Sequence, residues 1–240
     1  MHVGVIEFAV CAAAVLLGST VQGAVGVGLN MIAAPFVAIV IPEALPATLV
    51  LVAVPIAVTT IAREHHALDR VALPWMILGA LPGTGLGLLI VGSATPTTLA
   101  IIVGSTTLGG VVLSLLAPPV RTTRSTALVA GFASNLFGTA SAVGGPPVAL
   151  LFQHRTGPIA RATLGAFFAT SAGLSIIGYI AAGTITGDQV LLALALAPIM
   201  VNGLWASRYL HPHVDSGWLR PSVLTLSAIA GTVAIVRALA

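Results

Sequence analysis

The chain has 240 residues, of which 58% are hydrophobic and only 6% are charged. A soluble domain carries about 25% charged residues, so this composition excludes an ordinary water-soluble fold. The net charge of +3 comes from nine arginines spread one or two per loop, which form no basic patch and do not indicate a nucleic-acid-binding protein.

Long apolar stretches without charged residues recur along the whole chain. A transmembrane helix needs about 20 such residues. We predict six helical spans, at residues 43–62, 71–92, 97–117, 159–182, 188–209 and 219–238. The sequence therefore predicts an all-α polytopic membrane protein embedded in a lipid bilayer.

Two further apolar segments, residues 4–41 and 125–152, are interrupted by glycine. The second lies in a stretch of 30 residues between two arginines, too long for one crossing and too short for two. Each half of it would reach about 20 Å, enough to pass the bilayer midplane and return. We expect each segment to form a helical hairpin that breaks at its glycines, with two full spans as the alternative.

The two broken segments carry the same pattern, 116 positions apart. The matching positions are Ala24, Val27, Gly28, Ala33 and Phe36 in the first copy and Ala140, Val143, Gly144, Ala149 and Phe152 in the second. Residues 1–120 and 121–240 are therefore predicted to be two repeats, each a hairpin followed by three spans. An odd number of crossings would invert one repeat relative to the other.

The arginines decide between a hairpin and a single crossing. With hairpins, eight of the nine arginines lie on one face and Arg237 alone lies on the other, whereas single crossings divide them five to four. The positive-inside rule favours the hairpins, with the eight arginines in the cytoplasm and both termini outside.

The breaks are also where we expect a binding site. Backbone that is not helical at membrane depth must face protein or a wet cavity, and the helix leaving each break points its positive dipole end there. Such a helix N-terminus suits an anion. The candidate substrate-binding residues are Gln22, Gly28, Asn30, Asn135, Thr139, Ser141, Gly144 and Gly145. Kinks that serve only helix packing are the alternative.

The middle third of every predicted span lacks acidic, basic and histidine residues. Cation transporters and proton relays usually carry such groups there, so the pattern favours an anion or a neutral solute. We therefore predict neither an enzyme nor a metal site nor a cofactor. A separate pattern, Gly79, Gly83 and Gly87 at four-residue spacing, predicts close packing against a neighbouring helix.

The chain resembles the sulfite exporter TauE/SafE family over essentially its whole length. The motifs are Gly18-Ser-Thr-Val-Gln22-Gly23-Ala-Val-Gly26-Val-Gly28, Gly131-Phe-Ala-Ser-Asn135, Ser141-Ala-Val-Gly144-Gly145-Pro146-Pro147 and Arg161-Ala-Thr163. The resemblance implies a permease of a bacterial-type inner membrane that carries sulfite, sulfonates or other organosulfur anions. One departure is Leu29-Asn30, where the family often continues its glycine run, and this bears on the identity of the substrate.

The sequence thus predicts a secondary transporter that moves small oxyanions, sulfite or organosulfonates, across the plasma membrane. Its predicted partners are a small anionic substrate and the lipid bilayer. A passive channel and a non-transporting membrane assembly protein are the alternatives. The exact substrate, the direction of transport, the coupling ion and homo-oligomerisation stay open at this point.

Overall fold

The computed structural model describes residues 3–118, 120–153, 155, 157–210 and 219–240. Within these ranges the chain forms helices and no strands. They are α1 (Val5–Val25), α2 (Leu29–Val40), η1 (Pro42–Ala44), α3 (Ala47–Glu64), η2 (His65–Ala67), α4 (Ala72–Ser93), α5 (Pro96–Leu116), α6 (Arg124–Ser141), α7 (Gly145–Phe152), α8 (Gly157–Ala181), α9 (Gly187–Leu210) and α10 (Leu219–Leu239). The predicted all-α architecture is confirmed.

Six of these helices, α1, α4, α5, α8, α9 and α10, are long and apolar enough to cross a bilayer. Five of the six spans predicted from the sequence correspond to α4, α5, α8, α9 and α10 within a few residues. The span predicted from residue 43 begins later, at Ala47, because a 3₁₀ turn and Pro46 precede it. The protein is therefore a multi-pass membrane protein.

The two glycine-broken segments form helix pairs with arms of unequal length. At about 1.5 Å per residue, α1 extends about 31 Å and α2 about 18 Å, while α6 extends about 27 Å and α7 about 12 Å. The prediction of two arms of about 20 Å each in the second segment is therefore wrong. Gly138 lies inside α6 and does not end it, so the break comes later, at residues 142–144, directly before the Pro-Pro sequence.

Helix pairing follows the predicted repeat. A shift by 116 residues exchanges α1 with α6, α3 with α8, α4 with α9 and α5 with α10. Under that exchange the α4–α6 contact becomes the α9–α1 contact, and the α3–α8 and α5–α10 contacts map onto themselves. Such pairing is what two-fold-related halves would produce, and the inverted orientation of the halves stays a prediction.

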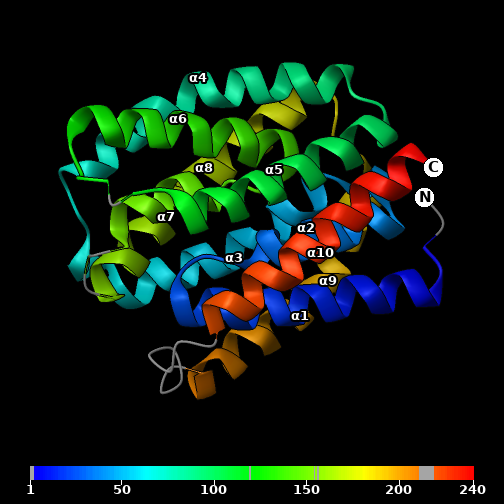
Figure 1. The fold of residues 1–240 in the computed structure, drawn as a ribbon, viewed down its shortest axis with the longest axis horizontal. Helices are drawn as coiled ribbons and strands as arrows, with labels where there is room; N and C mark the ends of the chain where they lie inside the picture. The colour runs from blue at the N-terminus through cyan, green and yellow to red at the C-terminus, as the bar shows by residue number, and fades with distance from the viewer. Residues whose placement is uncertain (1–2, 119, 154, 156, 211–218) are drawn as a thin grey trace.

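The two ends of the helix bundle differ in charge. Helices α3, α5, α7 and α9 end, and α4, α6, α8 and α10 begin, at one end of the bundle, whereas α1 begins and α10 ends at the other (Figure 1). In the sequence, eight of the nine arginines lie near these helix ends or in the segments between them, whereas Arg237 lies in the last turn of α10. This distribution agrees with the positive-inside argument, and which end is cytoplasmic stays a prediction.

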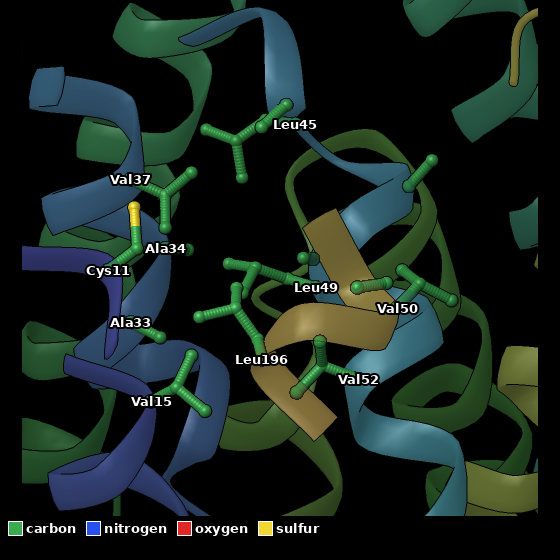
Figure 2. Close-up of a cluster of buried hydrophobic side chains, with 14 of the residues drawn as sticks. Cys11, Val15, Ala33, Ala34, Val37, Leu45, Leu49, Val50, Val52 and Leu196 are labelled. Carbon is green, nitrogen blue, oxygen red and sulfur yellow. The ribbon is translucent and has the colours of Figure 1, made fainter. Parts of the chain in front are cut away.

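The largest buried cluster lies between α1, α2, α3 and α9. Figure 2 shows Cys11 and Val15 of α1, Val37 of α2, Leu49 of α3 and Leu196 of α9 converging in this cluster. All five side chains are fully buried. The core therefore fixes the first hairpin against α3, which also forms one wall of the site described below.

A second contact, between α4 and α6, depends on glycine. A Cβ atom on Gly79 would collide with the carbonyl oxygen of Leu128, and one on Gly83 would collide with the backbone of Phe132. From the other side, a Cβ on Gly131 would collide with the backbone of Met76. The predicted close packing of the glycine face is confirmed, because backbone meets backbone along this contact.

Candidate substrate site

The two breaks end their first helices with the same backbone conformation and differ at the next glycine, which has φ +139° at Gly28 and φ −99° at Gly144. Gly26 ends α1 in a left-handed conformation with φ +93°, and Ala142 ends α6 with φ +64°. Gly28 has φ +139°, which an L side chain rarely adopts, and α2 starts at the next residue. The return helix α7 starts at Gly145. Both return helices therefore begin at the glycines, as predicted.

Both breaks line one cavity, together with α3 and α8. The cavity has a volume of about 70 Å³, which is enough for roughly five waters or one small oxyanion. Five of the eight predicted site residues lie in its wall: Gln22, Gly28, Asn30, Gly144 and Gly145. Apolar side chains, among them Met31, Val50 and Phe168, complete the wall.

The two breaks touch each other beside the cavity. A Cβ atom on Gly145 would collide with Cγ2 of Val27, so the start of α7 lies directly against the first break. A Cβ on Gly144 would collide with the carbonyl oxygen of Ser134 and would lie 3.0 Å from Cα of Gly138. These close approaches explain why the second break requires glycine at both positions.

Hydrogen bonds within the wall use some of the groups that a ligand could have bound. The N–H of Leu29 donates to Oε1 of Gln22 over 3.0 Å, so this amide caps the start of α2. The hydroxyl of Ser134 donates to the carbonyl oxygen of Gly144. The Oδ1 atom of Asn30 is buried and has no hydrogen-bond partner. At the start of α7, Pro146 and its neighbour Pro147 carry no N–H.

Three predicted residues, Asn135, Thr139 and Ser141, lie behind the cavity wall. Asn135 donates to the carbonyl of Ala80 over 3.1 Å, and its Oδ1 accepts from the hydroxyl of Ser171. The hydroxyls of Thr139 and Ser175 lie 2.7 Å apart. Since Ser171 and Ser175 both line the cavity, Asn135 and Thr139 hold the side chains that face it.

Ser141 stabilises the second break rather than the cavity wall. Its hydroxyl donates to the carbonyl of Phe137 over 2.7 Å and accepts from the hydroxyl of Thr106 over 2.9 Å. The N–H of Val143, inside the break, lies 3.3 Å from the same oxygen. Ser141 thus connects α5 to the break that positions Gly144.

The sequence analysis did not identify Ser134, Ser171 and Ser175 as cavity residues. Ser171 and Ser175 are four positions apart and therefore lie on one face of α8, a spacing that could have indicated a shared polar surface. Serines in membrane helices often bond their own backbone, so the spacing alone did not separate them from structural serines. Ser134 directly precedes Asn135, and of these two neighbours only Asn135 was predicted as a site residue.

The charged residues lie outside the cavity wall. Arg155 and Asp69 form an ion pair of 3.6 Å between the α7–α8 junction and the start of α4. Asp69 also accepts from the N–H groups of Val71 and Ala72. Among the described residues, no group of three or more His, Cys, Asp or Glu side chains could hold a metal ion.

A family model for the sulfite exporter TauE/SafE matches residues 10–233. The chain belongs to this family. The TauE/SafE match begins within α1 and ends within α10, so it covers both breaks and every residue that lines the cavity. Comparisons with curated proteins and with solved structures gave no match. As a TauE/SafE member with six helices of spanning length, the protein is a membrane transporter.

Proposed function

We propose that the protein is a secondary carrier that moves small sulfur oxyanions, sulfite or organosulfonates, across the plasma membrane. The observation that carries the proposal is the cavity itself, where two breaks from opposite halves of the chain meet. Transporters built of repeats bind their substrates at such paired interruptions. The TauE/SafE membership supports the class of substrate.

In this proposal the start of α7 binds the anion. Gly144 and Gly145 line the cavity at the start of α7, where the helix dipole is positive, and the absence of side chains lets an oxyanion approach their backbone N–H groups. Gln22 and Asn30 orient the anion from the first hairpin. Asn135, Thr139 and Ser141 are positioning residues that hold the cavity wall.

Alternating access needs contacts that open at one end of the carrier while those at the other end stay closed. Two hydrogen bonds, one toward each end of the bundle, are candidates for such contacts. At the start of α3, Thr48 donates to the carbonyl of Gln189 at the start of α9, over 3.2 Å. At the start of α8, Thr163 accepts from the N–H of Asp69 just before α4, over 2.9 Å. We propose that these equivalent contacts at opposite ends of the bundle open in turn.

The topology belongs to the same proposal. The end that carries eight arginines lies in the cytoplasm and both termini lie outside. The two halves, residues 1–120 and 121–240, are then inverted repeats, and the cavity at their interface alternates between the two faces of the membrane.

Counterflow in proteoliposomes tests the proposed function. Vesicles are loaded with unlabelled sulfite, an organosulfonate or acetate, and labelled sulfite is added outside. A carrier should accumulate label transiently, and only with the sulfur oxyanions inside. A matched pair of variants connects the activity to the cavity: Asn30→Leu should reduce counterflow strongly, whereas Gly173→Ala should not, because a Cβ at Gly173 meets no atom within 4 Å.

Two results would contradict the proposal. Equilibration of label without transient accumulation would indicate a passive channel. Absence of any sulfite-dependent flux from folded, inserted protein would exclude sulfite as the substrate.

A further inference from the structure

We propose that the cavity accepts singly charged oxyanions, so that sulfite binds as hydrogen sulfite rather than as the dianion. The inference rests on the proposed function and specifies the chemical form of the substrate. It follows from the charge of the cavity wall and from the hydrogen-bonding groups that the wall leaves free.

The wall of the cavity consists of neutral side chains and backbone. Its polar members are Gln22, Asn30, Ser134, Ser171 and Ser175, and the others are glycines and apolar residues. An anion that enters therefore contacts dipoles and no charged side chain of the wall. Stabilisation by fixed dipoles rises in proportion to the ionic charge, whereas the Born cost of leaving water rises with its square. Such a wall favours one negative charge over two.

The charged and titratable groups on the surrounding helices lie elsewhere. Arg161 of α8 lies beside Gly26, where an added Cβ would be 3.0 Å from its Cγ. Glu7 is in the first turn of α1, Arg63 in the last turn of α3, and Arg124 is the first residue of α6.

The hydroxyl protons of two of the three serines in the wall are already used. A serine hydroxyl has one proton and two lone pairs. Ser134 donates its proton to the carbonyl of Gly144, and Ser171 donates to Oδ1 of Asn135. What these two hydroxyls can still offer a ligand is an acceptor.

The remaining polar groups include both acceptors and donors. Oδ1 of Asn30 is a buried acceptor without a partner, and rotation of that amide about its Cβ–Cγ bond would turn it toward a ligand. The wall also has donors, in the side-chain amides of Gln22 and Asn30 and in the backbone N–H groups of Gly144 and Gly145, whereas the Leu29 N–H is occupied by Gln22. A ligand that brings its own O–H as well as acceptor oxygens fits this wall. Hydrogen sulfite has both, and the dianion has only acceptors.

The test is the pH dependence of sulfite exchange by the wild-type protein. Because the second proton of sulfite dissociates near neutral pH, a series of pH values, equal inside and outside, changes the ratio of the two forms. Initial rates of exchange are measured in proteoliposomes over a range of total sulfite, with protein-free vesicles subtracted for leakage. The measured quantities are the KM for total sulfite and the maximal rate.

If hydrogen sulfite is the substrate, the KM for total sulfite rises about tenfold per pH unit above the pKa of sulfite, and the KM calculated for hydrogen sulfite stays constant. Sulfate, which is doubly charged throughout, should not compete. The inference would be overturned if the KM calculated for the dianion stayed constant across the pH series, or if sulfate competed as well as sulfite does. Either result would still be compatible with a sulfite carrier. Absence of exchange at every pH would instead refute the proposed function, and the inference with it.

Discussion

The contact between Val27 and Gly145 offers a direct test of whether the two breaks form one site. Gly145→Ala adds a Cβ that would collide with Cγ2 of Val27, while the next atom, Cβ of Val27, lies 3.9 Å away. Carbon atoms normally pack at about 3.5–4.0 Å, so a single methyl group accounts for the whole conflict. Removing that methyl should therefore remove the conflict.

The size of the effect follows from this geometry. Overpacking of a well-packed region costs about 1–3 kcal/mol. At about 1.4 kcal/mol per factor of ten, the conformation in which the breaks touch would lose about 5- to 150-fold in population. We expect Gly145→Ala to reduce sulfite counterflow by a factor in that range. Val27→Ala combined with Gly145→Ala should restore counterflow to within about twofold of Val27→Ala alone.

The assay is the initial rate of counterflow for the wild type, both single variants and the double variant, each at equal reconstituted amounts. Gly173→Ala serves as the control for adding a methyl group to a membrane helix, because its Cβ meets no atom within 4 Å. A double variant no faster than Gly145→Ala would refute the reasoning, since the breaks would then not meet through Val27.

Three further predictions concern the parts of the fold that hold the site. Gly144→Ala should impair counterflow more than Gly145→Ala does, because its Cβ collides with a backbone carbonyl that cannot rotate away; equal activities would contradict this. Gly79→Ala should lower the thermal unfolding midpoint in detergent by overpacking α4 against α6, at a cost of about 1–3 kcal/mol, whereas Gly85→Ala in the same helix, where a Cβ meets nothing within 4 Å, should leave it unchanged or raise it. Asp69→Ala should cost about 1 kcal/mol through loss of the cap on α4, whereas Asp69→Asn keeps the cap and should lose less; equal midpoints for the two variants would show that the partly exposed ion pair with Arg155 matters more than the cap.

Local sequence was enough to predict the membrane class and the positions of the breaks. Apolar runs without charge force helices in a bilayer, because lipid cannot satisfy free backbone groups. Gly28 and Gly145 end up at the starts of the return helices because glycine adopts left-handed backbone and proline suits a first helical turn. The α4 glycine face was predictable for the same reason, since its spacing is a property of one helix.

The length of each hairpin arm was not predictable in this way. Gly138 is a glycine close to the break in sequence, yet it lies within α6, with its Cα 3.0 Å from the Cβ position of Gly144. A glycine weakens a helix by about 1 kcal/mol at most, and packing against neighbouring helices can exceed that. The end of α6 therefore depends on contacts that lie far away in the sequence.

The division between residues that line the cavity and residues that support it was decided by tertiary structure alone. Asn30 and Asn135 are equally polar and each lies close to a break, yet one lines the cavity and the other bonds Ser171 behind it. Sequence determined that both breaks exist and that each would need polar partners, because these are local demands of the backbone. That the two breaks meet, and which side chains line the space between them, depends on how α3 and α8 pack from opposite halves of the chain. No local sequence pattern carries that information.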